Sequence, residues 1–387
     1  MRVLFVIHGP KDPCTAVYAW TCARASLLEA RGHRTEVLAP EDCTELAGRP
    51  PRWRPLLFPL AVARRLRRSE TLPDVAVFHS FSGWAALVAR RLDPRLAGLR
   101  AITQFHGLEP LHYRAMRAER RRGGRPFRLR FRLFQEAVMP VLLRLACRRS
   151  DLVACLNRAE RAALVARRWA RPEKVVVVPN AAPPEAFVER RARAPLRRLL
   201  FLGQWLDGKG VRYLVEAFAA LAAERPDLEL ACVGTRTDPQ AVLAAFPADL
   251  RDRVRVVASA GRQLVAAELR AADLFVFPTL AEGSSLSLLE AMAAALPIVT
   301  TPVGAAPDLL RDGESVLFVP PADAAAIVRA VRRLLADPAL AAGLGAQARG
   351  IAERHAWERL APAWTELIEG LAAAPGAPLE RLQAARP

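Results

Sequence analysis

Short continuous runs of apolar residues alternate with segments of helical periodicity along the first half of the chain. Such unbroken runs are typical of strands buried on both faces, as in a parallel sheet. The strands predicted in this half are Arg2–Ile7, Asp74–Phe78, Ala101–Gln104, Leu152–Cys155 and Val175–Val178. Helices are expected between them, at Val17–Arg31 and Ala85–Leu92. This order predicts an open parallel sheet covered by helices.

A second series of the same kind follows Ala181–Arg198, whose prolines and charges are typical of a linker. Its predicted strands are Arg198–Leu202, Leu228–Val233, Val254–Val257, Leu274–Phe277 and Ile298–Thr300. Its predicted helices are Val211–Glu224, Gln263–Ala271, Ser287–Ala295 and Ala324–Leu335. The fold class is therefore α/β, with two doubly wound, Rossmann-like domains whose sheets face a ligand-binding cleft. We expect a first domain at 1–190, a second at 191–356, a helix at 357–371 that crosses back to the first domain, and a flexible tail at 372–387.

Composition supports a globular protein, because 52% of the 387 residues are hydrophobic. The formal charge of +18 lies entirely in Met1–Arg190, where Gly48–Ser69 has seven Arg and no acidic residue, and Arg114–Arg149 has twelve Arg and two Glu. A basic surface of this kind suits a phospholipid surface, a lipid-linked phosphate or nucleic acid. It is also compatible with an ordinary solvated face in an arginine-rich protein.

One segment of this basic half, Phe131–Arg149, is amphipathic. Its apolar residues recur near helical spacing at Phe131, Phe134, Val138, Val141, Leu142 and Leu145. One interpretation is a helix packed on the sheet and kinked at Pro140. The other is a surface whose arginines dock on anionic lipid or on a polyprenyl-linked diphosphate.

The sequence favours a cytoplasmic protein. No apolar run approaches the roughly 20 residues needed to span a bilayer, so any membrane contact is expected to be peripheral, at the inner face of the cell membrane. The apolar start of the chain reads as a strand rather than a signal peptide. The six cysteines form no C-x-x-C pair, which favours free thiols in a reducing compartment.

The segment Ala272–Thr300 carries the strongest chemical signal. A strand ends at Pro278, a small polar loop follows, and a helix is expected to begin near Ser287. Main-chain N–H groups at such a helix start form a seat for a diphosphate. The residues concerned are Glu282, Gly283, Ser284, Ser285, Leu286 and, eight positions after the first Glu, Glu290.

The Glu–seven residues–Glu spacing, followed by Ala-Met-Ala and a Pro-Ile-Val strand, resembles the donor-binding motif of the retaining GT-B glycosyltransferases of family 4. The resemblance implies that Glu282 contacts the donor sugar and Glu290 the ribose of the nucleotide. It extends to Phe201–Gly210, which is similar to a family segment that binds the donor diphosphate through Arg and Lys. Lys209 matches that Lys and is the only lysine of the neutral half, whereas Gln204 stands where the family has Arg.

The first half resembles the family less completely. His106, in the segment Ala101–Pro110, matches a histidine that lies near the reacting sugar in family members, so we assign it with Lys209 and Glu282 as a catalytic candidate. Thr15 and Ala16 replace the family's glycine pair, which favours an acceptor contact over a donor contact there. His79 is more plausible as a structural residue. The acceptor-side candidates together are Gly9, Thr15, Ala16, His79, Arg114 and Arg117.

The resemblance implies an enzyme that transfers a sugar, with retention, from a nucleotide-diphosphate sugar to an acceptor hydroxyl in cell-surface polysaccharide or glycolipid synthesis. The acceptor is expected to be anionic or carried on a lipid. No D-x-D triplet is present, so no metal and no cofactor is expected. A sugar-nucleotide epimerase or phosphorylase of the same fold, or a binding subunit with weakened activity, would also fit. Nucleic acid is disfavoured, because the basic stretches lack an evident aromatic stacking platform.

Overall fold

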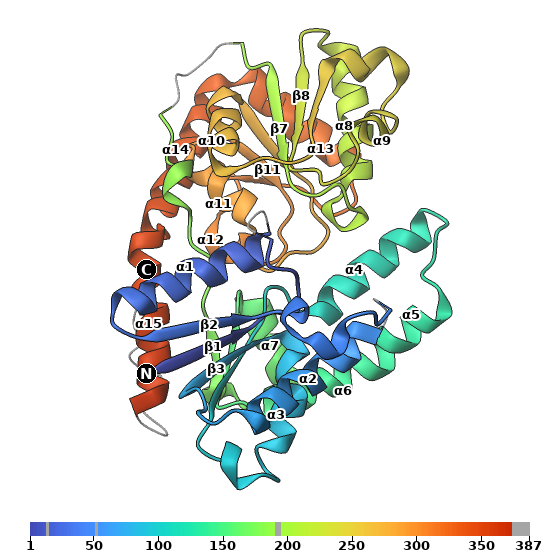
Figure 1. The fold of residues 1–387 in the computed structure, drawn as a ribbon. Helices are drawn as coiled ribbons and strands as arrows, with labels where there is room; N and C mark the ends of the chain where they lie inside the picture. The colour runs from blue at the N-terminus through green and yellow to red at the C-terminus, as the bar shows by residue number, and fades with distance from the viewer. Residues whose placement is uncertain (13–14, 51–52, 190–194, 374–387) are drawn as a thin grey trace. The chain divides into compact units, whose positions relative to one another are not determined.

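The computed structural model describes residues 1–387 except 13–14, 51–52, 190–194 and 374–387. It contains two parallel sheets with helices around them, as the sequence predicted, and each sheet has six strands where five were expected (Figure 1). The chain divides into two compact units. The first comprises 1–110, 127–179 and the residues from Glu358 onward, and the second comprises 111–126 and 180–357. Most of the expected tail at 372–387 lies outside the described residues, and the expected domain limits stay predictions.

The sheet of the first unit has the order β2-β1-β3-β4-β5-β6. Its strands are β1 (Arg2–Val6), β2 (Arg34–Leu38), β3 (Val75–His79), β4 (Arg100–Gln104), β5 (Leu152–Cys155) and β6 (Val175–Val177). The sequence missed β2, because this edge strand alternates exposed and half-buried residues and carries no continuous apolar run. All neighbouring pairs are parallel, so the carboxyl ends of these strands share one edge.

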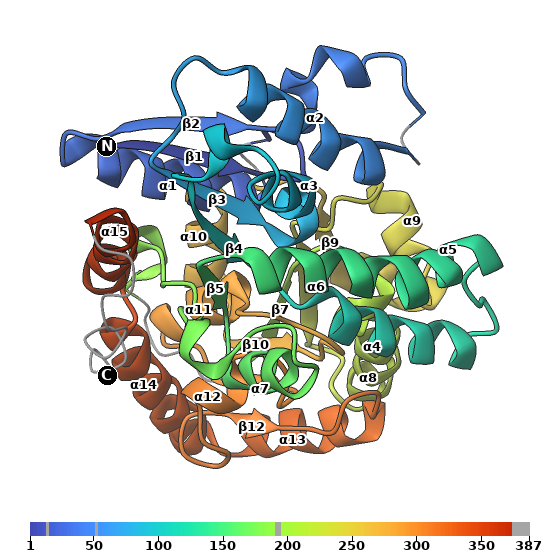
Figure 2. The same cartoon turned by 90° about the horizontal axis from the view of Figure 1, so that it is seen from below.

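Helices cover both faces of this sheet. They are α1 (Ala16–Ala30), α2 (Arg54–Arg68), α3 (Trp84–Ala89), α5 (Leu129–Leu133), α6 (Met139–Arg149), α7 (Arg158–Ala166) and α15 (Trp357–Ala373). One core joins the sheet to α1 and α15, whereas a second core on the other face joins it to α2, α3 and α6 (Figures 1 and 2). The strands therefore need apolar side chains on both faces, which is why they appear in the sequence as unbroken runs.

The sheet of the second unit has the order β12-β11-β10-β7-β8-β9. Its strands are β7 (Arg198–Leu202), β8 (Glu229–Val233), β9 (Val254–Val257), β10 (Leu274–Phe277), β11 (Ile298–Thr300) and β12 (Leu317–Phe318). Its helices are α8 (Val211–Glu224), α9 (Pro239–Leu243), α10 (Arg262–Ala271), α11 (Leu286–Ala293), α12 (Ala306–Leu309), α13 (Ala324–Ala336) and α14 (Pro338–Arg354). One large apolar core holds these elements together.

A helix from an earlier part of the chain also belongs to the second unit. From Leu111 onward, α4 (Glu109–Arg122) groups with the second sheet rather than with the first. Ala115 packs against the core of this unit, and the Tyr213 hydroxyl donates a hydrogen bond of 2.6 Å to the buried carboxylate of Glu119. The predicted acceptor-side residues Arg114 and Arg117 lie on this helix and hence in the second unit.

The amphipathic segment 131–149 is helical without a break but is not uniformly α-helical. A π-helical turn at Phe134–Val138 joins α5 to α6, and Pro140 is the second residue of α6, directly after this turn. The interpretation that its apolar residues pack on the sheet is wrong for Phe131, Val138 and Val141, which are 40%, 38% and 55% exposed.

Two glycines let the loops of the second unit approach one another closely. Gly210 has a left-handed φ of +69°, and a Cβ placed there would lie 1.9 Å from the carbonyl oxygen of Pro278. Gly304 has a φ of +62°, and its Cβ would lie 2.6 Å from the carbonyl oxygen of Gly283. Any side chain at either position must displace the loop that follows β10.

We expect Gly210→Ala to lower the free energy of unfolding by at least about 2 kcal/mol, because the left-handed conformation and the clash with Pro278 both oppose a Cβ. The matched control is Gly343→Ala in α14, where nothing lies within 4 Å of the added Cβ. That change should be neutral or stabilising by up to about 1 kcal/mol. Urea unfolding of both variants measures this. Equal free energies of unfolding for the two variants would contradict the close approach of the Pro278 carbonyl to Gly210.

Candidate functional site

Lys209 and Glu282 form an ion pair where two neighbouring strands end. Lys209 closes the short turn Asp207–Lys209 after β7, and Glu282 lies in the loop after β10, the strand paired with β7. The side chains are 25% and 12% exposed, so the charges are largely shielded from water. Thr279 Oγ1 donates a 3.0 Å hydrogen bond to Glu282 Oε1, and Lys209 Nζ lies 5.4 Å from the centre of the Phe277 ring. The structure thus brings together the two side chains that the sequence assigned to the donor.

The polar loop after Glu282 is fixed before it enters α11. Asn180 donates from Nδ2 to the main-chain oxygen of Ser284 at 2.7 Å, and its own N–H donates to the Ser284 hydroxyl. Ser285 caps α11 by accepting a hydrogen bond from the N–H of Leu288. The helix begins at Leu286, so the first-turn N–H groups that follow the loop have no helical acceptors. This arrangement suits an anion, and it places Gly283 to Leu286 at the start of the helix as predicted.

Glu290 lies on α11 one turn inside the helix. Burial raises the pKa of its carboxyl group to about 7, although Arg262 opposes this increase. No described residue donates a hydrogen bond to this carboxylate. The guanidinium of Arg262 instead bonds Glu185, at 2.9 Å. Glu290 therefore has hydrogen-bonding capacity that the protein itself does not use.

Gln204 departs from this arrangement. It lies in the extended residues after β7, its side chain is exposed, and it makes no hydrogen bond to another described side chain. Leu206 N–H bonds its main-chain oxygen, so the backbone is held while the amide is not. The structure does not bring Gln204 into the Lys209–Glu282 pair.

Sequence reasoning missed His112, which belongs to the same neighbourhood. This α4 residue interacts electrostatically with both Lys209 and Glu282, and burial lowers the pKa of its imidazole. No sequence motif includes His112, which lies almost 100 residues before Lys209. The sequence contains one indication: His112 has helical spacing from Met116 and Glu119, so the three side chains share one face of a helix.

In the first unit, His79 and His106 contact one another at the carboxyl ends of β3 and β4. His106 Nε2 lies 3.0 Å from His79 Nδ1, so one imidazole donates to the other. Burial lowers the pKa of both groups, with a value of about 3 for His106. The buried Arg24 of α1 adds to both shifts and stacks on Trp364 of α15 at 4.0 Å. Sequence reasoning did not identify Arg24, a buried charge in a helix predicted only by its apolar spacing.

A second polar pair lies beside these histidines in the sequence. Ser80 has a left-handed φ of 55°, and its hydroxyl donates to Glu109 Oε1. Burial raises the pKa of Glu109 to about 7, and the carboxylate of Glu160 contributes. Strained backbone of this kind concentrates at functional sites.

A pocket of about 390 Å³ opens at the carboxyl end of β1. Its polar lining includes His8, Glu41 and Arg54, with Phe58 and Phe81 as apolar walls, and the predicted acceptor residue Gly9 borders it. Thr15 and Ala16 start α1, with the Thr15 hydroxyl donating to the Asp12 carbonyl at 2.7 Å. The structure thus places Gly9 at a cavity.

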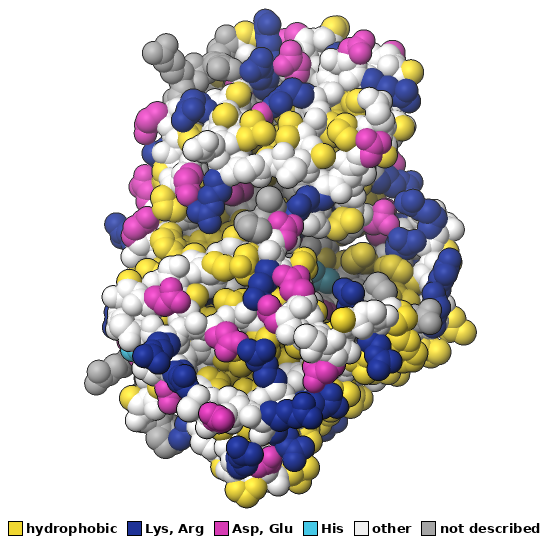
Figure 3. Space-filling view, in the orientation of Figure 1, with side chains coloured by type: hydrophobic (Ala, Val, Ile, Leu, Met, Phe, Trp, Pro, Cys, Tyr) yellow, Lys and Arg dark blue, Asp and Glu magenta, His cyan; other side chains and the backbone are white. Residues whose placement is uncertain are grey.

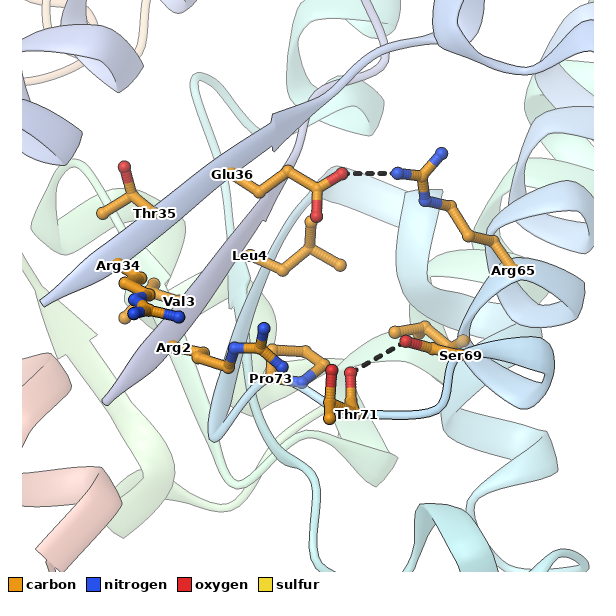
Figure 4. Close-up of a pocket in the computed structure, with 11 residues that line it drawn as sticks. Arg2, Val3, Leu4, Arg34, Thr35, Glu36, Arg65, Ser69, Thr71 and Pro73 are labelled. Carbon is orange, nitrogen blue, oxygen red and sulfur yellow. Dashed lines mark hydrogen bonds and ion pairs between the residues drawn. The ribbon is translucent and has the colours of Figure 1, made fainter.

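Another pocket, of about 430 Å³, lies at the opposite edge of the first sheet, where β1 and β2 begin (Figure 4). Arg65 from α2 points to Glu36 across it and bonds that carboxylate at 2.6 Å, while Ser69 bonds the main chain of Thr71. No predicted site residue lines this pocket. Since ligands of open α/β sheets bind at the carboxyl ends of the strands, we do not assign it to the reaction.

Among the helices of the described residues, none combines the length and the apolar character of a membrane span. The same residues contain no group of three or more His, Cys, Asp or Glu side chains placed to hold a metal ion.

Two family profiles match successive parts of the chain. "Glycosyltransferase Family 4" matches residues 16–186, and "Glycosyl transferases group 1" matches residues 197–337. The chain belongs to this family of glycosyltransferases. The second match includes Lys209, Glu282 and Glu290, and the first includes His79 and His106.

Individual proteins of known name or structure are similar to this chain. A phosphatidyl-myo-inositol mannosyltransferase of Mycolicibacterium smegmatis is 31% identical over 206 residues, which are 50% of this chain and 52% of that protein. The chain spans about half the length of the curated relatives it matches first. Sucrose-phosphate synthase of Thermosynechococcus elongatus has the same fold, with a TM-score of 0.76 at 21% identity over 96% of this chain and 99% of that one. HepE of Anabaena, solved with UDP-glucose, has a TM-score of 0.67 at 16% identity, over 96% of this chain and 100% of that one.

We expect Glu290→Gln to stabilise the free protein at alkaline pH. Between pH 4.5 and about 7 the unfolded state loses the Glu290 proton while the folded state keeps it, so the wild type loses stability as pH rises through this range. The glutamine variant has no such loss and should be more stable by about 2 to 3 kcal/mol at pH 8 and equal at pH 4. Chemical unfolding at both pH values tests this, with the exposed Glu314→Gln as control. If the free energy of unfolding of the variant exceeds that of the wild type by no more at pH 8 than at pH 4, the buried placement of Glu290 is contradicted.

Proposed function

We propose that this family member transfers a sugar from a nucleotide-diphosphate sugar to an acceptor hydroxyl, with retention at the anomeric carbon, in cell-surface polysaccharide or glycolipid synthesis. The observation that carries the proposal is the shielded Lys209–Glu282 pair beside the start of α11. A lysine at the end of one strand and a helix start at the end of the next supply positive charge to one diphosphate. That HepE was solved with UDP-glucose supports this class of donor.

In the reaction the bond between the anomeric carbon and the diphosphate oxygen breaks, and the acceptor oxygen bonds that carbon from the same face. The acceptor proton passes to the departing diphosphate. The chemical demand is stabilisation of the charge that develops on the leaving group, and Lys209 with the first-turn N–H groups of α11 meets it. Glu282 holds Lys209 in place and accepts hydrogen bonds from the sugar, while the unused carboxylate of Glu290 accepts from ribose hydroxyls. In this proposal the reaction needs no metal.

Acceptor recognition is assigned to the first unit. The pocket at Gly9 combines His8 and Arg54 with the Phe58 and Phe81 rings, so it suits a molecule with both polar and apolar parts. His106 and its partner His79 remain candidates for contact with the reacting sugar, as neutral imidazoles.

We also propose that α5 and α6 bind an anionic membrane at the inner face of the cell membrane. Leu129 and Leu133 are four residues apart, the π-turn sets Val138 five residues further on, and Val141 follows after three, so the four side chains form one stripe. All four are exposed. Arg130 and Arg144 of these two helices and Arg128, directly before α5, are also exposed, and Figure 3 shows basic and hydrophobic side chains side by side there. Exposed apolar residues framed by arginines complement a lipid surface with anionic head groups.

The enzymatic proposal predicts slow release of nucleoside diphosphate and free sugar when the protein is incubated with UDP-glucose or GDP-mannose without acceptor. Lys209→Ala should lower this rate by about 100-fold or more, because it removes charge from the leaving group. Arg270→Ala on α10, an exposed residue of the same unit, is the control. Anion-exchange chromatography separates the products.

The alternatives give other products. An epimerase converts the nucleotide sugar to an isomer, and a phosphorylase needs inorganic phosphate. A Lys209→Ala variant with near-normal turnover would remove Lys209 from the mechanism. If the wild type turns over none of the nucleotide sugars, the result favours the alternative of a binding subunit with weakened activity.

The membrane proposal predicts that the protein sediments with vesicles of phosphatidylglycerol and phosphatidylcholine at 0.1 M salt. The double change Arg128→Glu and Arg130→Glu should weaken this binding more than tenfold, since each basic residue contributes about 1 kcal/mol near an anionic surface. Arg359→Glu on α15, which packs on the other face of the same sheet, should have little effect. Failure of the wild type to sediment would overturn the proposal.

A further inference from the structure

The position of His112 is set by three contacts of α4 within the second unit. Residues 112, 116 and 119 lie on one face of the helix, at spacings of four and three. Glu119 is bonded to Tyr213, and Met116 lies against Gly208, where an added Cβ would meet its side chain at 3.4 Å. The guanidinium of Arg120 bonds Asp207, two residues before Lys209, at 3.4 Å. The helix is thus held against the turn that carries Lys209.

The hydrogen bonds of His112 define which ring nitrogen is available. The imidazole donates a hydrogen bond to the main chain of Glu282, whereas Nε2 is buried and has no hydrogen-bond partner among the described residues. The donor is therefore Nδ1–H. Burial and the adjacent Lys209 cation both disfavour a second proton, so Nε2 carries a lone pair and acts only as an acceptor.

A lone pair at this place restricts what can bind there. The phosphates of a nucleotide sugar at neutral pH are acceptors without protons, so they would be repelled by Nε2. The sugar is the part of the donor next to the diphosphate, and its hydroxyl groups can donate. An unpartnered buried acceptor is costly, and a sugar hydroxyl removes that cost when it binds.

We propose that His112 is a specificity-determining residue for the donor sugar, and that its Nε2 accepts a hydrogen bond from one sugar hydroxyl while Lys209 holds the diphosphate. This inference rests on the proposed function, because it requires a nucleotide-sugar donor at Lys209. It assigns to α4, a helix outside both donor motifs, a direct contact with the sugar.

The test compares matched ligand pairs by calorimetry: UDP with UDP-glucose, and GDP with GDP-mannose. His112→Phe keeps a ring of similar size but has no acceptor, whereas His112→Gln places an amide oxygen near the position of Nε2. We expect the phenylalanine variant to bind the preferred nucleotide sugar about tenfold more weakly, with the affinity for its free nucleoside diphosphate changed less than twofold. The glutamine variant should recover part of the loss.

The other outcomes separate two failures. If His112→Phe weakens both members of a pair equally, or neither, the inference is wrong while the proposed function stands. If the wild type binds neither pair, the proposed function fails, and the inference fails with it.

A measurement on the wild type covers the case in which the variants do not fold. Analogues of the preferred nucleotide sugar that each lack one hydroxyl should include one that binds about tenfold more weakly. In any His112 variant that folds, this analogue should bind about as tightly as the complete nucleotide sugar does. No hydroxyl with such an effect would overturn the inference.

Discussion

The ion pair between Lys209 and Glu282 is the constraint to which the rest of the second unit is fitted. Both side chains follow neighbouring parallel strands, so the sheet itself sets their separation. Gly210, directly after the lysine, lies where the carbonyl of Pro278 leaves no room for a side chain, and the carbonyls of Glu282 and Gly283 leave none at Gly304. A partly buried charge pair contributes little net stability, because desolvation offsets much of its attraction. Such a pair makes physical sense as a preorganised site, in which a bound diphosphate finds its cation already positioned.

The two units differ in the kind of surface they present. The excess of basic residues lies in Met1–Arg190, and the structure divides that excess. Some of its arginines belong to the second unit, where Arg120 of α4 and Arg125, three residues beyond the end of that helix, bond Asp207. Others frame the exposed apolar stripe of α5 and α6 in the first unit. Of these two groups, the second combines charge with exposed apolar side chains, as the proposed contact with a lipid surface requires.

Much of the fold could be predicted from the sequence, because buried parallel strands are unbroken apolar runs. β5, β7, β9, β10 and β11 begin and end at the predicted residues. The missed strands have a physical reason: β2 is an exposed edge strand, and β12 has only two residues. The π-turn before α6 was not predicted. It changes the hydrogen-bond pattern over only five residues, and apolar residues near helical spacing fit an α-helix as well.

The site was predictable where local motifs carry it. Lys209, Glu282 and the loop before α11 lie where strand–loop–helix patterns predicted them. Contacts between distant segments were not predictable, so His112 and the stacking of Arg24 on Trp364 appeared only in the structure. Gln204 shows the converse case: the motif assigned it to the diphosphate, and the structure leaves its side chain exposed.

The central claim is that the Lys209–Glu282 pair is a diphosphate site. It is tested most directly by titrating the protein with UDP and UMP, and with GDP and GMP, in a calorimeter. The account predicts that one nucleoside diphosphate binds at least about tenfold more tightly than its monophosphate, and that Lys209→Ala abolishes the difference. Equal affinity for diphosphate and monophosphate in the wild type, or an advantage that survives the loss of Lys209, would contradict it.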